Sequence, residues 1–141
     1  MSIFDSEKNE MILCRDHFGI KPLVYFQDEE WFLAGSEIKQ FLPFDNFKPV
    51  LNKEVAVNFL TNGWLNYSEQ TFFKNVYELR GGDYLIYNIV KNSSIITQWY
   101  NLKKMIKPVT DDYETAVKKV SDIFLRCVKL RMRSDVAVGS C

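Results

Sequence analysis

The chain has 141 residues, enough for one domain of ordinary size or for parts of two. Lysine plus arginine and aspartate plus glutamate number 18 each, so the formal net charge is zero and gives no electrostatic case for a nucleic-acid or anionic-membrane partner. Phe, Tyr and Trp make up 15% of the residues, well above a disordered composition, which indicates a packed globular fold.

The cysteines and the first residues of the chain indicate the cellular compartment of the protein. Cys14, Cys127 and Cys141 are far apart and lack C-x-x-C spacing, so neither a disulfide framework nor a zinc site is indicated. All three lie in apolar runs that favour burial over reactivity. The opening MSIFDSEKNEM lacks a secretory pattern, and no apolar run approaches the ~18–20 residues of a membrane span. We therefore expect a cytoplasmic protein with no membrane partner.

The first third of the chain has strand patterns. SIF and EMILCR are joined by the polar DSEKNE, which predicts a β-hairpin over residues 2–15. PLVYF and WFLAG flank QDEE and predict a second hairpin. Ser36 is a candidate N-cap for a short helix that ends at Pro43.

A helix and a third hairpin follow. From Asn52 to Asn62, an N-cap, an early Glu and apolar residues at helical spacing predict a helix, with Gly63 as its stop. GGDYLIYNIVKNSSIITQWY holds two β-rich runs around KNSS and predicts a hairpin. The sheet is therefore expected to be mostly antiparallel.

The pattern changes after residue 100. Residues 101–110 show few patterns typical of a helix or strand. Thr110 or Asp111 is a candidate N-cap for the helix that follows, and Asp111 and Glu114 fit a capping box. The following helix repeats apolar residues at three- and four-residue steps, so one face must be buried. VAVGSC then predicts the first buried strand of a parallel sheet. Both ends look cut, and we expect a fragment that spans a domain boundary near residues 101–110.

Candidate functional residues are few. His17 is the only histidine, so we expect a locally bonded loop histidine rather than a triad or a multi-histidine metal site. The glycine pair in ELRGGDY predicts a turn, because phosphate-binding loops need more glycines before a helix. RDHFGIKP is more specific, since Gly19 can adopt positive φ and Pro22 keeps Lys21 extended. It predicts a structured corner, with direct ligand contact as the alternative.

Several stretches together resemble the glutamine-hydrolysing asparagine synthetase family, in order and spacing, across nearly the whole chain. They are FDSEKNEMILCRDHFGIKPL, GSEIKQFL, TFFKNVYELRGGDYL, QWYNL and RSDVAVG. The first contains the R-D-x-x-G-x-K-P-L segment, which is shared with other class II glutamine amidotransferases. Further matches downstream narrow the resemblance from class II amidotransferases in general to the asparagine synthetase family. They are Ser36, Glu37, Lys39, Thr71, Phe73, Leu79, Gly82, Tyr84, Leu85, Trp99, Arg133, Ser134, Asp135, Val136 and Gly139.

This resemblance implies an α+β fold in two parts. Residues 1–100 would be the C-terminal part of an N-terminal-nucleophile hydrolase (αββα) amidotransferase domain. Residues 101–141 would be a linker and the first helix and strand of an α/β adenine-nucleotide-binding synthetase domain. In the family, ammonia released from glutamine reaches a second site, where ATP and Mg²⁺ convert aspartate to β-aspartyl-AMP. Glutamine, aspartate and ATP are the implied substrates, and a homodimer is an implied assembly of the full-length form.

The resemblance also implies site residues. The family's catalytic cysteine, its substrate-holding arginine and its Asn-Gly-Glu element have no counterparts here, so we expect no catalytic or metal-binding residue and an inactive fragment that binds cofactors poorly. Cys141 stands where the family has an apolar residue whose backbone contacts adenosine. The implied structural, tunnel-adjacent residues are Arg15, Asp16, Gly19, Lys21, Pro22 and Glu37.

Two departures leave other interpretations open. Ala137 stands where the family usually has Pro, and Gly81 replaces the Pro of a Pro-Gly turn. They suggest a divergent relative, such as an amidotransferase that acts on another carboxylate. A non-catalytic relict or interaction module, covered by a partner chain, is the alternative from a different class.

Overall fold

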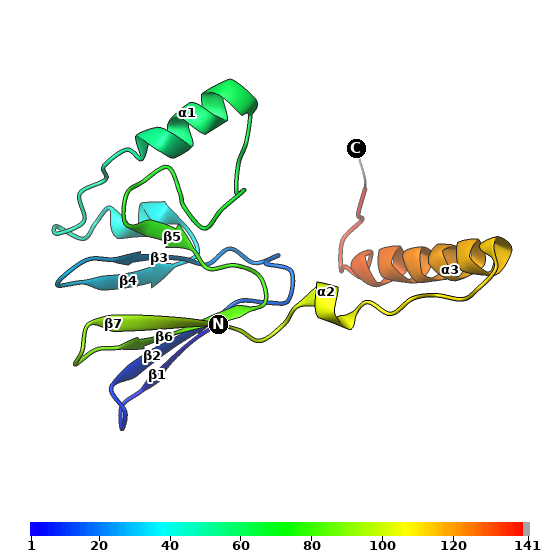
Figure 1. Cartoon of the computed structure of the whole chain (residues 1–141), viewed down its shortest axis with the longest axis horizontal. Helices are drawn as coiled ribbons and strands as arrows, with labels where there is room; N and C mark the ends of the chain where they lie inside the picture. Colours follow the sequence, from blue (N-terminus) through cyan, green and yellow to red (C-terminus); the bar gives the residue numbers. More distant parts are fainter. Residues whose placement is uncertain (140–141) are drawn as a thin grey trace. The chain divides into compact units, whose positions relative to one another are not determined.

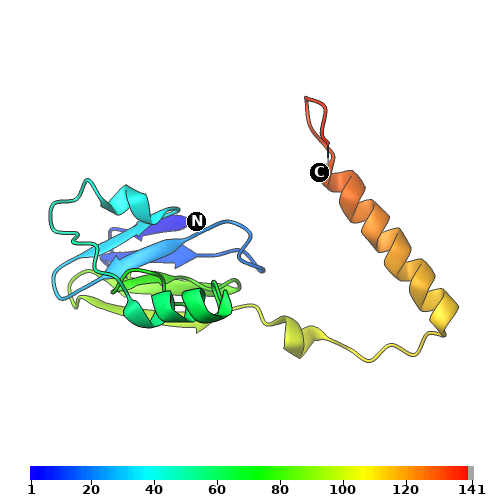
Figure 2. The same cartoon turned by 90° about the horizontal axis from the view of Figure 1, so that it is seen from above.

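The computed structural model describes residues 1–139 (Figure 1). The chain forms two compact units, Met1–Lys104 and Met105 onward, which are considered separately below. The first unit contains two β-sheets, which lie as two layers in Figure 1 and overlap in the view from above in Figure 2.

The strands of the first unit pair antiparallel throughout. One sheet has the order β1 (Ser2–Asp5), β2 (Glu10–Cys14), β6 (Asp83–Asn88) and β7 (Ser93–Gln98). The other has the order β4 (Phe32–Gly35), β3 (Val24–Gln27) and β5 (Val76–Glu78). All three predicted hairpins are confirmed as β1–β2, β3–β4 and β6–β7. β5 was not predicted, because a strand of three residues is too short to show alternation of apolar and polar side chains.

The main core lies between the sheets. Cross-strand partners Leu13 and Leu85 are fully buried there, and Phe32 of one sheet stacks on Tyr87 of the other with ring centroids 4.1 Å apart. The buried members of this cluster are Leu13, Leu23, Tyr25, Leu79, Leu85 and Tyr87. Alternation along β2, β3 and β6 places four of these side chains inward, whereas Leu23 and Leu79 lie next to the ends of β3 and β5.

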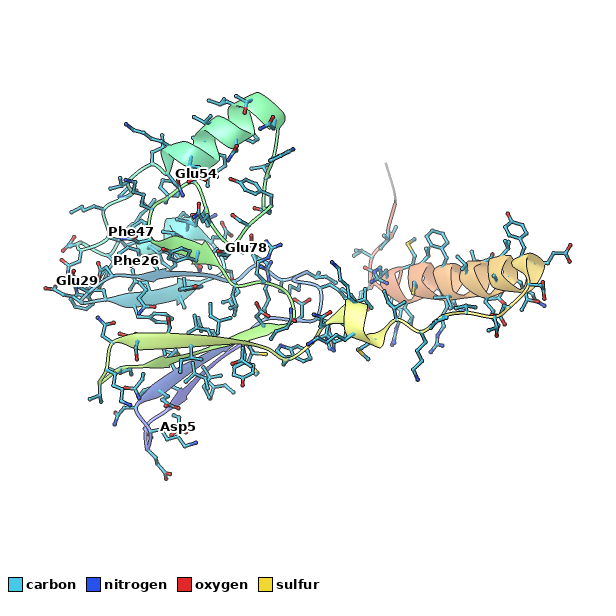
Figure 3. All side chains as sticks on the ribbon, in the orientation of Figure 1. Asp5, Phe26, Glu29, Phe47, Glu54 and Glu78 are labelled. Carbon is cyan, nitrogen blue, oxygen red and sulfur yellow. The ribbon has the colours of Figure 1, made fainter. Side chains whose placement is uncertain are left out.

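A second cluster covers the other face of the smaller sheet. Phe26 packs edge-on against Phe47 at 5.2 Å, and the two labelled rings lie together in Figure 3. Phe41 joins them from the short 3₁₀ helix η1 (Ile38–Phe41). The N-cap residue of η1 is Glu37, one position after the predicted Ser36, because the Gln40 side chain accepts hydrogen bonds from the backbone N–H groups of both.

Helix α1 (Lys53–Asn62) confirms the predicted helix and both of its ends. The Asn52 side chain accepts a hydrogen bond from the Val55 N–H, and Gly63 ends the helix in the left-handed region with φ 67°.

The second unit corrects two predictions. Helix α3 (Tyr113–Arg131) begins after Asp112, whose carboxylate accepts hydrogen bonds from the N–H and hydroxyl of Thr115. The predicted N-caps Thr110 and Asp111 are therefore wrong, and Asp111 instead pairs with Lys119 at 2.7 Å. Residues 136–139 are not a strand, since a parallel strand requires a partner and no partner strand pairs with them in the described part of the chain.

The apolar stripe of α3 is present as predicted, but none of the helix residues is buried, so the expected buried face is not found in the described residues. The short helix α2 (Leu102–Met105) precedes α3 and was not predicted. None of the helices within residues 1–139 combines the length and the apolar character that crossing a bilayer requires.

The central core should dominate the stability of the first unit. We expect Leu13→Ala to lower the free energy of unfolding by about 2–5 kcal/mol, because it leaves a cavity at a side chain with no solvent exposure. Leu60→Ala, on a side chain that is 81% exposed, should change it by less than about 0.5 kcal/mol. Chemical denaturation of both variants provides the measurement, and equal effects would contradict this location of the core.

Candidate functional site

The corner between β2 and β3, residues 15–22, joins the two sheets and contains five of the predicted site residues. Asp16 shapes it from within: one carboxylate oxygen accepts hydrogen bonds from the N–H groups of Phe18 and Ile20, and the other accepts from Lys21 at 3.0 Å. These N–H donors, with Lys21 first, lower the pKa of Asp16 to about 2. Asp16 therefore acts as a loop cap in its ionised form.

Arg15 holds the corner against β5. Its side chain is only 8% exposed, and its Nη1 donates to the Glu78 carboxylate at 2.7 Å and to the Leu79 carbonyl. Nε donates to the Lys21 carbonyl at 2.9 Å, and Nη2 donates to the Gly19 carbonyl at 2.7 Å. A buried guanidinium is stable only when its donors are paired, so these bonds fix the path of the loop.

Glycines allow the corner to lie directly on the turn before β6. A Cβ atom on Gly81 would come within 2.5 Å of the Gly19 nitrogen, so no larger residue fits there without a backbone shift. Gly82, with φ 79°, donates its N–H to the Asp16 carbonyl at 2.9 Å. The Gly pair is thus the predicted turn, and close backbone packing gives a physical reason for Gly81.

An aromatic cluster lies beside this contact. The carbonyl of Gly82 accepts hydrogen bonds from the N–H groups of Trp99 and Tyr100, which follow β7. The His17 ring packs against the same two residues, with centroids 4.5 Å from Trp99 and 4.6 Å from Tyr100. His17 is therefore a local packing residue, and its recorded contacts are ring edges rather than the expected hydrogen bonds.

Two hollows flank the corner, and both are lined by Arg15 and His17. The smaller, about 360 Å³, is mostly apolar, with Lys21, Pro22 and Trp99 among its walls. The larger, about 630 Å³, is mostly polar and is lined by Glu78, Arg80 and Asp83 as well. The sequence pattern missed the last three residues because they come from two strands and the turn between them, more than 50 residues away along the chain.

Asp83 is the least satisfied group at this site. Its buried Oδ1 has no hydrogen-bond partner within the described residues. Burial raises the pKa of its carboxyl group, and the charge of Arg80 only partly offsets this effect.

The remaining predicted residues lie elsewhere. Glu37 is exposed, forms an ion pair with Lys39 at 2.6 Å and lines neither hollow. Cys141, the predicted adenosine contact, lies outside the described residues. Cys14 and Cys127 are half-buried free thiols, whereas their apolar surroundings predicted burial.

The resemblance implies Mg²⁺ and ATP as cofactors of the full-length protein, and only a metal cluster can be looked for in the described residues. Within residues 1–139, no three His, Cys, Asp or Glu side chains are grouped closely enough to hold a metal ion.

Comparisons with known proteins identify the family of the chain. A family model described as glutamine amidotransferase domain matches residues 1–100, so the chain belongs to this family. The chain is 32% identical over 152 residues to asparagine synthetase [glutamine-hydrolyzing] 2 of Bacillus subtilis, covering 99% of this chain and 20% of that protein.

Two fungal proteins are similar to a comparable degree. Amidase chry2 of Gibberella zeae is 30% identical over 97% of this chain and 20% of its own length. Amidase chyE of Penicillium rubens is 31% identical over the same shares. The chain spans only 20 to 27% of the length of its curated relatives.

The Asp16 cap should make stability depend on pH in the acid range. A carboxyl group whose folded pKa is lowered from 3.8 to about 2 contributes stability that is present above pH 4 and is lost as the pH falls through about 2. Asp16→Asn should therefore be less stable than the unaltered chain at pH 7, and the difference should shrink between pH 4 and 2. Thermal unfolding across this range tests the prediction, with Asp45→Asn in an exposed loop as the control. A difference independent of pH would contradict it.

Asp83 should show the opposite dependence. Because its folded pKa is raised, the ionised form costs stability once the pH rises above the ordinary value near 3.8. We expect Asp83→Asn to raise the free energy of unfolding by about 1 kcal/mol at pH 7, the scale of an unsatisfied buried acceptor, and to have little effect at pH 3. Denaturant titrations at both pH values provide the test, and a loss of stability at pH 7 would show that Oδ1 has a partner.

Proposed function

We propose that the chain is part of a glutamine-dependent, ATP-driven amide-forming ligase of the asparagine synthetase type. In this proposal, residues 1–100 contribute to the amidotransferase domain and residues 101–141 begin the synthetase domain. The observation that carries it is the extent of the likeness: the family match ends at residue 100, whereas the similarity to the B. subtilis synthetase covers 99% of the chain. The likeness is therefore not confined to the amidotransferase part.

The proposed chemistry separates two steps. Glutamine is hydrolysed in one domain, and the released ammonia attacks an activated carboxylate of aspartate in the other, with ATP and Mg²⁺ supplying the activation when bound. Both intermediates have to be kept from water, which favours rigid walls along the path between the sites. In this proposal the Arg15 corner, with a hollow on each side, supplies such a wall and contains no reacting group.

A second candidate function changes the acceptor. The amidases chry2 and chyE are about as similar to this chain as the asparagine synthetases are, so sequence identity does not favour aspartate over another carboxylate. This candidate keeps glutamine as the nitrogen donor and assigns the corner the same role.

The experiment uses the whole protein that contains this chain. With glutamine, ATP and aspartate, we expect one glutamate to be released for each asparagine formed. Lys21→Ala removes a side chain from the apolar hollow, and we expect it to lower glutamine-dependent amide formation about tenfold while ammonia-dependent formation is retained. Lys8→Ala, on an exposed turn, is the control.

The outcomes separate the candidates. Glutamate release with an amide formed only on a different carboxylate would establish the second function. No glutamine hydrolysis would contradict both, and equal losses in the glutamine and ammonia reactions would contradict the assigned role of the corner.

A further inference from the structure

Helix α1 ends on an asparagine that is followed directly by a glycine. Asn62 is the last residue of the helix, and Gly63 is its cap. Every other asparagine in the sequence is followed by a residue with a side chain. Because glycine has no Cβ, its backbone nitrogen is the least hindered of any residue, and its backbone reaches conformations that are closed to the others. The Asn62–Gly63 peptide is therefore the one place in the sequence where an asparagine amide lies beside such a nitrogen.

The helix end restrains this nitrogen. The Gly63 N–H donates to the Phe59 carbonyl at 2.9 Å, and Gly63 lies in the left-handed region with φ 67°. The nitrogen can reach the side chain of Asn62 only after this hydrogen bond breaks and residue 62 leaves its helical conformation. Helix ends fray, so the opening requires no unfolding of the rest of the domain. The reacting atoms and the restraining bond all lie within residues 59–63.

We propose that Asn62 is a site of spontaneous deamidation, gated by opening of the last turn of α1. The Gly63 nitrogen forms a bond to Cγ of Asn62, the Cγ–Nδ2 bond breaks, and ammonia leaves with the proton that the nitrogen carried. The product is a five-membered succinimide ring. Water then opens the ring at either of its carbonyl groups and gives aspartate or isoaspartate. The step uses only the thermal lability of asparagine and needs no oxidant, metal or enzyme.

Both products alter the end of α1. Each places a carboxylate at the C-terminus of a helix, where the macrodipole disfavours negative charge. Isoaspartate also inserts a methylene group into the main chain, so the hydrogen bond from Gly63 to Phe59 no longer closes a helical ring of the ordinary size. The reaction therefore weakens the cap that restrained it.

The change is passed to the loop that follows α1. Asn58 Nδ2 donates to the Tyr67 hydroxyl at 2.8 Å, and Arg80 Nη1 donates to the carbonyls of Asn66 and Ser68, each at 3.1 Å. Asn66 and Arg80 also line the polar hollow beside the corner. Deamidation thus loosens one wall of this hollow as a molecule ages. The chemistry is independent of the proposed function, because water is its only other reactant.

Peptide mapping of the whole protein that contains this chain, after incubation at mildly alkaline pH, tests the proposal. Mass spectrometry locates the conversion of amide to acid, and chromatography separates the aspartate and isoaspartate peptides. We expect Asn62 to react faster than every other asparagine of the chain. Unfolding in urea should raise its rate about tenfold, as the loss of one hydrogen bond of ordinary net strength predicts. Conversion at Asn62 no faster than at the other asparagines would overturn the site, and equal rates with and without urea would overturn the gate.

Gly63→Ala separates the chemistry from the gate. A Cβ at Gly63 would meet no atom within 4 Å, so alanine fits, although the left-handed φ disfavours it. The weakened cap opens more often, whereas the added methyl group hinders the nitrogen, and we expect conversion at Asn62 to fall about tenfold or more. Gly139→Ala, at another glycine with open space around it, is the matched control and should leave the rate unchanged.

The same comparison made in urea requires no folding, so it holds even if Gly63→Ala destabilises α1. Conversion of Asn62 in Gly63→Ala at the unaltered rate, or faster, would overturn attack by the Gly63 nitrogen.

Discussion

The buried guanidinium of Arg15 is the constraint on which the first unit depends. It binds the carbonyls of Lys21 and Gly19 within its own loop and reaches Glu78 and Leu79 at the end of β5. Unpaired guanidinium donors in the interior would cost more free energy than the conformational entropy that the loop gives up when it is ordered. The carbonyl groups of the loop therefore turn inward and accept hydrogen bonds from Arg15. One side chain thus joins the loop that connects the two sheets to the strand beside it.

The close packing around the corner follows from this constraint. Once the loop is held against β5, the Asp16 carbonyl meets the Gly82 N–H, and Gly81 and Gly19 approach backbone to backbone. The carbonyl of Gly82 then binds Trp99 and Tyr100, which carry the chain out of the sheet. The corner therefore determines both the junction of the sheets and the direction in which the first unit ends.

Two carboxylates near the corner have opposite environments. Asp16 is surrounded by backbone N–H donors that stabilise its charge, whereas Asp83 has a buried oxygen with no partner in the described residues. Native structures leave few buried polar atoms unsatisfied, so the orphaned oxygen of Asp83 is unusual.

The sequence by itself determined the three hairpins, the two longer helices and the family. The alternation in EMILC and DYLIYN, the N-cap Asn52 and the stop at Gly63 depend on neighbouring residues only, so they could be predicted. RDHFGIKP indicated a corner because Gly19 and Pro22 restrict the backbone locally. These local rules could not distinguish Asp112 from Asp111 as the N-cap of α3, because the two adjacent aspartates have the same capping side chain.

Only the tertiary structure decided the long-range partners. Pairing of Arg15 with Glu78, of Asp16 with Gly82 and of β2 with β6 joins residues more than 60 positions apart, for which no local pattern exists. The same holds for the orphaned oxygen of Asp83, since burial is a property of the assembled sheets. Local sequence sets which conformations a segment prefers, whereas the packing of distant segments decides which polar groups remain without a partner.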